Sequence, residues 1–217
     1  MSDLSFLDVI KTDCSEYLQK CKTEQSFLLR GIKIDDSAAV TKFETAKPRK
    51  RCETDHDTIN DVVNAFLKKR KLPTRAGASF ATTRAETAKQ FGNLFYIFPC
   101  DDFSFCYAEL VVDLYPKLER WLSSGEALEK SFGRVRNMIS DCGSDLYLLD
   151  LYCDRSKKMI EHVHNNFLNN FNFKTNEIEI ALREGFEIWF HGSYYAIPVS
   201  LFKSDRDKEV FFDFFLN

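Results

Sequence analysis

The sequence is poor in glycine, proline and tryptophan, which number 8, 5 and 2 among 217 residues. So few glycines disfavour a glycine-cradled phosphate site, and there is no Walker-type loop, glycine-rich dinucleotide fingerprint or Gly-x-Ser-x-Gly elbow. No apolar run reaches the roughly 18 residues of a membrane-spanning helix, so we expect no membrane partner. The chain does not begin with a basic stretch followed by an apolar one, which predicts no secretory signal.

A large excess of one charge is also missing, because 30 Lys and Arg oppose 33 Asp and Glu and leave a net charge of −3. The molecule as a whole is therefore not suited to bind a polyanion, and only a local patch could do so. The seven cysteines contain no Cys-x-x-Cys pair, and His162 and His164 would face different sides of a helix. We expect reduced thiols, a cytoplasmic location and no metal.

Phenylalanine is abundant, with 21 residues, in a chain that is 44% hydrophobic and 29% charged. This composition is typical of a folded protein, and a chain of this length can build one core without disulfides or metal. We predict a single domain over residues 1–217 whose core is filled largely by phenyl rings. Two small domains are also compatible with the length.

Hydrophobic periodicity predicts a mixture of helices and strands. Helices are expected at residues 1–24, 57–71, 84–91, 115–123, 126–139 and 154–171. Strands are expected at residues 26–32, 79–83, 94–98, 105–114, 178–182, 186–190 and 194–199, the last two joined as a hairpin by His191-Gly192-Ser193. Residues 35–57 are expected to form a loop or a short irregular helix. Because strands and helices do not alternate regularly, the predicted fold class is α+β.

Three segments stand out when they are taken together: Leu29-Arg30-Gly31-Ile32, Ser79-Phe80-Ala81-Thr82-Thr83, and residues 186–197, which carry Glu187. A charged side chain in an apolar strand is costly to desolvate unless it is paired or faces a cleft. Arg30 and Glu187 both occupy such strands, which makes them candidate functional residues.

In the order and spacing of these segments the sequence resembles the mono-ADP-ribosyltransferases of the Arg–Ser–Glu, cholera-toxin-like class, which includes host-modifying transferases of T-even bacteriophages. The resemblance lies in Leu-Arg-Gly-Ile at 29–32, Phe-Ala-Thr-Thr at 80–83 and Glu-Ile-Trp-Phe-His-Gly-Ser-Tyr at 187–194. It implies two packed, mainly antiparallel sheets around a cleft with flanking helices. The amphipathic segment 1–24 would pack on this domain, and a phage protein would act in the host cytoplasm.

The resemblance also implies an activity: cleavage of the nicotinamide–ribose bond of NAD and transfer of ADP-ribose to a host protein or nucleic-acid acceptor. Glu187 would be the catalytic residue, because a fixed carboxylate stabilises the positive charge that develops on the ribose. Arg30 beside Gly31 would bind the diphosphate of NAD. Thr82 and Thr83 would orient Glu187 and the ribose, and Arg84 would add a phosphate contact. NAD would serve as substrate, without metal.

One position departs from the family pattern. Members that modify arginine carry a second Glu two residues before the catalytic one, where this chain has Gly185. Alternate strand residues share a face, so position 185 would lie beside Glu187 without offering a side chain to the acceptor. Arginine is therefore disfavoured as the acceptor. Glu184 would point to the other face unless a bulge re-aims it.

Structural interpretations remain open for each of these residues. Arg30 could be a salt-bridged strand residue, Thr82 or Thr83 a helix cap, and Glu187 the solvent-facing residue of a hairpin. Trp189 is expected to contribute to packing, with stacking on the rings of the cofactor as the alternative. A transferase fold that has lost its activity is also compatible with Gly185.

A second function class comes from the basic segment 47–75. From Lys42 to Arg75 there are ten basic and five acidic residues, a local charge of +5. Such a run is commonly a solvated face, but it could also bind nucleic acid or an acidic partner. The candidate contacts are Lys47, Arg49, Lys50, Arg51, Lys68, Lys69, Arg70 and Lys71, with Arg75 nearby. In this alternative the protein is a non-catalytic binding or regulatory factor.

Overall fold

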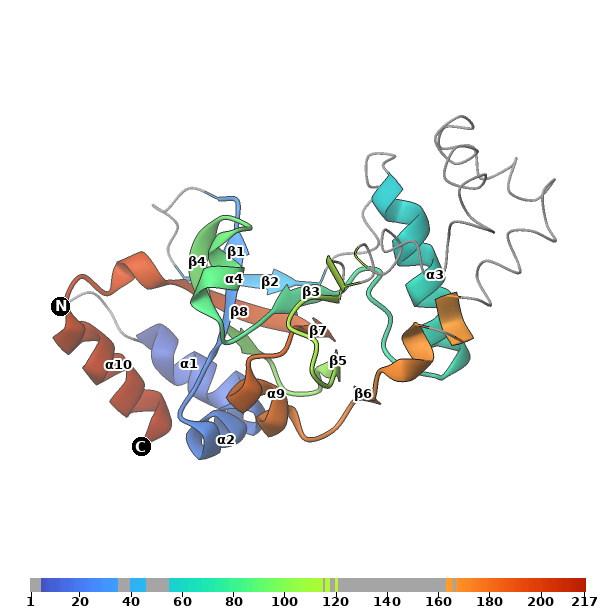
Figure 1. The fold of residues 1–217 in the computed structure, drawn as a ribbon. Helices are drawn as coiled ribbons and strands as arrows, with labels where there is room; N and C mark the ends of the chain where they lie inside the picture. The colour runs from blue at the N-terminus through green and yellow to red at the C-terminus, as the bar shows by residue number, and fades with distance from the viewer. Residues whose placement is uncertain are drawn as a thin grey trace.

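The computed structural model describes residues 5–34, 40–45, 55–114, 116–117, 120, 163–165 and 167–217. The helices predicted at 126–139, over most of 115–123 and over most of 154–171 lie outside these residues, as do the basic residues 47–51. The described chain forms two four-stranded antiparallel sheets and several helices (Figure 1). The predicted α+β class is therefore confirmed.

The first sheet has the strand order β1-β4-β8-β2. Its strands are β1 (Leu28–Ile32), β4 (Asn93–Pro99), β8 (Ser193–Pro198) and β2 (Thr41–Glu44). The predicted strands at 26–32, 94–98 and 194–199 correspond to β1, β4 and β8. In contrast, β2 lies within the segment that was expected to form a loop or an irregular helix, and it pairs with β8.

The second sheet has the order β3-β7-β5-β6. Its strands are β3 (Ser79–Ala81), β7 (Ile188–His191), β5 (Ser104–Ala108) and β6 (Phe173–Lys174). The predicted hairpin at His191-Gly192-Ser193 is wrong, because β7 and β8 belong to different sheets. Both edges of β7 are taken by β3 and β5, so the chain crosses at Gly192, whose φ is 127°, into the first sheet.

Helices lie at both ends of the sheets and also along them (Figure 1). They are α1 (Ser5–Asp13), α2 (Ser15–Glu24), α3 (Asp55–Lys69), α4 (Ala85–Lys89), α9 (Ile178–Glu184) and α10 (Asp205–Leu216), with short 3-10 turns at η1 (Leu168–Asn170) and η2 (Val199–Leu201). The N-terminal helix expected over 1–24 is divided at Cys14 into α1 and α2. The strand predicted at 178–182 is wrong, because this segment is the helix α9.

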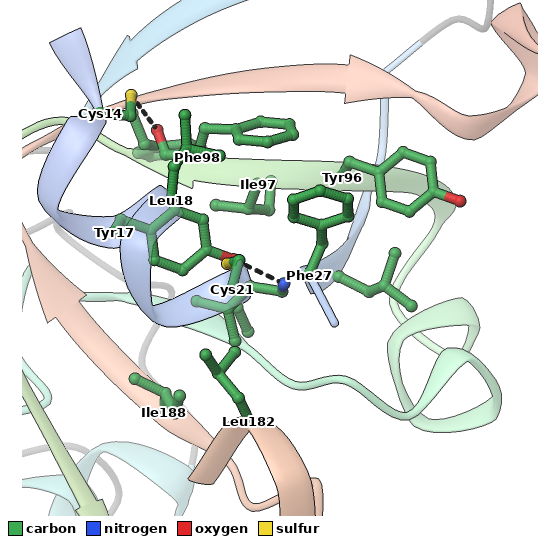
Figure 2. Close-up of a cluster of buried hydrophobic side chains, with 14 of the residues drawn as sticks. Cys14, Tyr17, Leu18, Cys21, Phe27, Tyr96, Ile97, Phe98, Leu182 and Ile188 are labelled. Carbon is green, nitrogen blue, oxygen red and sulfur yellow. Dashed lines mark hydrogen bonds between the residues drawn. The ribbon is translucent and has the colours of Figure 1, made fainter. Parts of the chain in front are cut away.

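Aromatic rings fill the core between the first sheet and the helices α2 and α10. Phe27, Phe98, Phe211 and Phe215 are all buried, and their neighbouring ring centroids lie 5.1 to 6.1 Å apart. Figure 2 shows how α2 supports this cluster: the backbone N–H of Leu28 donates to the Tyr17 hydroxyl at 2.7 Å, and the Cys14 thiol donates to the Phe98 carbonyl at 3.4 Å. The predicted phenyl-rich core is confirmed for these residues.

A second apolar cluster covers the other face of the second sheet. Val62, Val63, Phe66 and Leu67 of α3 form it together with Trp189 and other residues. Residues Ile188 and Phe190 of β7 belong instead to the first cluster, because successive strand residues point to opposite faces. The strand that follows Glu187 therefore stands between two apolar layers.

Four cysteines lie in the described part of the chain, and Cys14, Cys21, Cys100 and Cys106 are all free thiols. Burial raises the pKa of Cys106 to about 12, so it stays protonated at neutral pH. None of the helices within the described ranges is long and apolar enough to cross a membrane.

Candidate active site

Backbone hydrogen bonds bring together the three segments that resemble the transferase motifs. The N–H of Leu29 donates to the carbonyl oxygen of Thr82 at 2.7 Å, and the N–H of Thr82 donates back to Leu29 at 3.0 Å. The adjacent strand β3 pairs with β7, so Ala81 lies opposite Ile188. Thr82 therefore links the strand of Arg30 to the strand that follows Glu187, although these segments lie far apart in the sequence.

Glu187 is buried, with 9% of its surface exposed. Its Oε1 atom lies 2.9 Å from Nη1 of Arg75, and its Oε2 atom accepts a hydrogen bond from the backbone N–H of Leu114 at 3.0 Å. The backbone N–H of Glu187 donates to the carbonyl oxygen of Val111. The side chain is thus not solvent-facing, as the hairpin interpretation required, and its ion-pair partner is Arg75.

The environment of Glu187 acts on its ionisation in two opposing ways. Burial raises the pKa of this carboxyl above its ordinary value, and the positive charge of Arg75 offsets part of that increase. A raised pKa in a buried carboxyl beside a specific charge is common in functional sites, but structural ion pairs produce it as well.

Arg75 is the residue of this site that the sequence reasoning did not assign. Only 8% of its surface is exposed, and its Cζ atom lies 4.5 Å from the Phe80 ring centroid and 5.2 Å from that of Trp189. The sequence places it after a basic run, which suggested surface charge. The sequence did contain one indication that Arg75 differs from the run at 68–71. Arg75 has no basic neighbour, and it comes shortly before a predicted strand that carries an aromatic residue.

The loop that carries Arg75 is fixed by three side chains. Asn64 of α3 accepts hydrogen bonds from the backbone N–H groups of Arg75 and Ala76 at 2.8 and 3.1 Å. The indole N–H of Trp189 donates to the Pro73 carbonyl at 2.9 Å, and Nε2 of His191 lies 2.7 Å from the Thr74 carbonyl oxygen. The loop therefore lies against β7 and stays close to Glu187.

Thr82, Thr83 and Arg84 fasten the end of α9. Their side chains donate to the carbonyl oxygens of Gly185, Leu182 and Glu184 at 3.1, 3.0 and 2.9 Å, respectively. These bonds satisfy carbonyls that have no partner within the helix. The three side chains thus hold the segment that leads into Glu187 by binding its backbone.

The backbone conformation explains why a glycine occupies position 185. It ends α9 with a φ of 71°, a left-handed conformation that favours glycine. A Cβ atom here would also lie 2.7 Å from Nε of Arg84. The expectation that position 185 lies beside Glu187 on one strand is wrong, because β7 begins at Ile188, after the turn.

Arg30 is half-buried in β1 and lies opposite Phe95 of β4. The neighbouring Gly31 is required by packing, because a Cβ atom there would collide with the carbonyl oxygen of Ala88 in α4. Arg30 directly follows Leu29, whose backbone pairs with Thr82. Gly31 allows the close approach of α4 to β1.

The basic segment divides into exposed and paired residues. Lys68, Lys69, Arg70 and Lys71 are exposed at the end of α3, where Arg70 stacks on Phe66 and donates to Asn169. In contrast, Lys42 forms an ion pair with Asp13 at 3.1 Å, and Arg75 is buried against Glu187. The charge of Lys42 is therefore paired at the surface, and that of Arg75 is buried.

No group of three His, Cys, Asp or Glu residues that could hold a metal ion occurs in the described ranges. His164 instead lies with its Nε2 atom 3.0 Å from the carbonyl oxygen of Val62.

A comparison with models of protein families, with characterised proteins and with solved structures finds no match to this chain.

Proposed function

We propose that this protein is an NAD-dependent mono-ADP-ribosyltransferase. The observation that carries the proposal is the double hydrogen bond between Leu29 and Thr82, together with the pairing of β3 and β7. Three short segments that resemble the family's motifs are thereby neighbours in space. The two packed antiparallel sheets are also compatible with the fold that the resemblance implies.

In the proposed reaction the bond between the ribose C1′ atom and the nicotinamide nitrogen breaks, and its electron pair leaves with nicotinamide. A nucleophile of the acceptor then bonds to C1′ and gives up its proton, so the products are ADP-ribosylated acceptor, nicotinamide and a proton. Glu187 stabilises the positive charge on the ribose. Arg30 binds the diphosphate, and Thr82 and Thr83 keep the segment of Glu187 in place through their bonds to α9.

The buried ion pair between Arg75 and Glu187 has to open for this reaction. Arg75 lies against the Glu187 carboxylate, so its side chain has to move away before the ribose can reach that group. The backbone of Glu187 need not change, because the Leu114 N–H continues to hold the second carboxylate oxygen.

The experiment compares label transfer from NAD to host-cell proteins by the wild type and two Gln variants. Glu187→Gln should abolish transfer and nicotinamide release, because the amide cannot stabilise the developing charge. Glu184→Gln is the matched control, since Glu184 is an exposed residue at the end of α9, three residues before Glu187. Circular dichroism establishes that both variants fold. Transfer that persists in a folded Glu187→Gln variant would contradict the proposed mechanism.

A second candidate function is binding of nucleic acid or an acidic partner through the end of α3. Its support is the run of four exposed cations from Lys68 to Lys71. Binding through these residues would weaken steeply as salt is added, because counterions are released from the polyanion. Titration of an oligonucleotide at several salt concentrations distinguishes this candidate from a transferase that responds only to NAD.

A further inference from the structure

The guanidinium of Arg75 has spare hydrogen-bonding capacity. It carries several N–H donors, and its contact with Glu187 is a distance of 2.9 Å between Nη1 and Oε1. Even this contact lacks hydrogen-bond geometry, since Nη1 is a buried atom without a hydrogen-bond partner. A buried donor without a hydrogen-bond partner is costly, and an anion with several acceptor oxygens would relieve the cost.

The surroundings of Arg75 favour such an anion. The faces of Phe80 and Trp189 stabilise the positive charge without using the N–H donors, which lie in the plane of the guanidinium. Phosphate oxygens can accept two parallel hydrogen bonds from that plane, which the single contact with Glu187 does not provide. A diphosphate group is therefore a better partner for Arg75 than Glu187 is.

We expect the side chain of Arg75 to move while the backbone of its loop stays in place. The backbone on either side of Arg75 is held by Asn64, Trp189 and His191. A long arginine side chain can rotate from one acceptor to another while these bonds persist. Glu187 would then keep its bond from the Leu114 N–H and become accessible.

We propose that Arg75 is an anion-operated latch on Glu187. Without a ligand its guanidinium covers the Glu187 carboxylate, and it moves to the diphosphate of an incoming dinucleotide, which uncovers that carboxylate. The identity of the dinucleotide as NAD rests on the proposed function, whereas binding of a diphosphate by Arg75 does not. In this proposal Arg75 binds the diphosphate and also controls access to the Glu187 carboxylate.

Trp189 reports directly on the latch, because the guanidinium lies against its ring. The other tryptophan is Trp121, so the Trp121→Phe variant isolates the emission of Trp189. Inorganic pyrophosphate is the probe. It should change the emission of Trp189, and Arg75→Gln should weaken its binding about 10- to 100-fold, as expected for the loss of charge-assisted hydrogen bonds. Arg206→Gln, an exposed arginine on α10, is the control and should bind as the parent does.

The variant Arg75→Gln leaves Glu187 buried without its cation and could unfold. The double variant Arg75→Gln/Glu187→Gln removes both charges, and it should fold and also fail to bind pyrophosphate. Pyrophosphate binding that is unchanged in this double variant, or a Trp189 emission that never responds, would overturn the latch.

Activity measurements separate the latch from the proposed function. If pyrophosphate binds through Arg75 while NAD is not turned over, the latch stands and the transferase function fails. If NAD is turned over and a folded Arg75→Lys variant has the same kcat and KM as the wild type, the latch fails and the function stands. A lysine keeps the charge but lacks the planar fork, so the latch predicts a raised KM for NAD.

Discussion

At the scale of single residues, the Arg75–Glu187 pair is the feature of the site with the largest expected effect on stability. Both side chains are buried, so each needs the other to compensate for the loss of water. Sequence reasoning identified Glu187 from its place in an apolar strand, but it could not identify the partner. Charge in the sequence does not show burial, and Arg75 became part of the core only because Phe80 and Trp189 surround it.

Arg75→Met should lower the free energy of unfolding by about 3–5 kcal/mol, because it leaves an unpaired carboxylate in an apolar layer. The double variant Arg75→Met/Glu187→Leu should recover most of that loss, since it removes both charges and keeps similar volume. Urea unfolding followed by circular dichroism measures both values. Equal stability of the single variant and the wild type would show that the pair is not buried in solution.

At the scale of elements, a helix or strand was predicted correctly where its apolar residues recur at regular intervals. The helix α3 was predicted because its apolar residues recur at helical intervals. In α9 the residues Ile178 and Ile180 alternate with Glu and suggested a strand, whereas the structure buries Ile178, Ala181 and Leu182, which have helical spacing. A short segment can fit both periods, and tertiary contacts decide between them.

The helix α10 was not predicted, although its start carries a recognisable signal. The Ser204 hydroxyl accepts the N–H of Asp207 at 3.1 Å, and the Asp207 carboxylate accepts the N–H of Ser204 at 3.0 Å. This capping box precedes the run that supplies Phe211 and Phe215 to the core.

Ser204→Ala should reduce stability by about 1 kcal/mol, because an N–H in the first turn of α10 loses its acceptor. In a chain of this size that corresponds to a decrease in Tm of about 2–4 °C. Ser200→Ala is the control, since Ser200 is exposed in η2. Thermal unfolding should show a decrease for the first variant alone, and equal Tm values for the two would argue against the cap.

At the scale of the whole molecule, the α+β class followed from the sequence, but the division of strands between two sheets did not. Partners such as Leu29 and Thr82 lie about fifty residues apart, and no local pattern encodes their pairing. The same applies to the crossing at Gly192, which looked like a hairpin turn because the two strands are consecutive. The candidate site depends on this long-range arrangement, so its residues could be named from the sequence while their contacts could not.

We propose that NAD binds beside the Leu29–Thr82 pair, where β1 lies next to β3 and β3 pairs with β7. Calorimetric titration of NAD into the wild type, Arg30→Ala and the exposed control Arg206→Ala tests it most directly. We expect the wild type and the control to bind NAD equally, and Arg30→Ala to bind about 1.5–3 kcal/mol more weakly because charge-assisted hydrogen bonds to the diphosphate are lost. A wild type that does not bind NAD, or an Arg30→Ala variant with unchanged affinity, would contradict the claim.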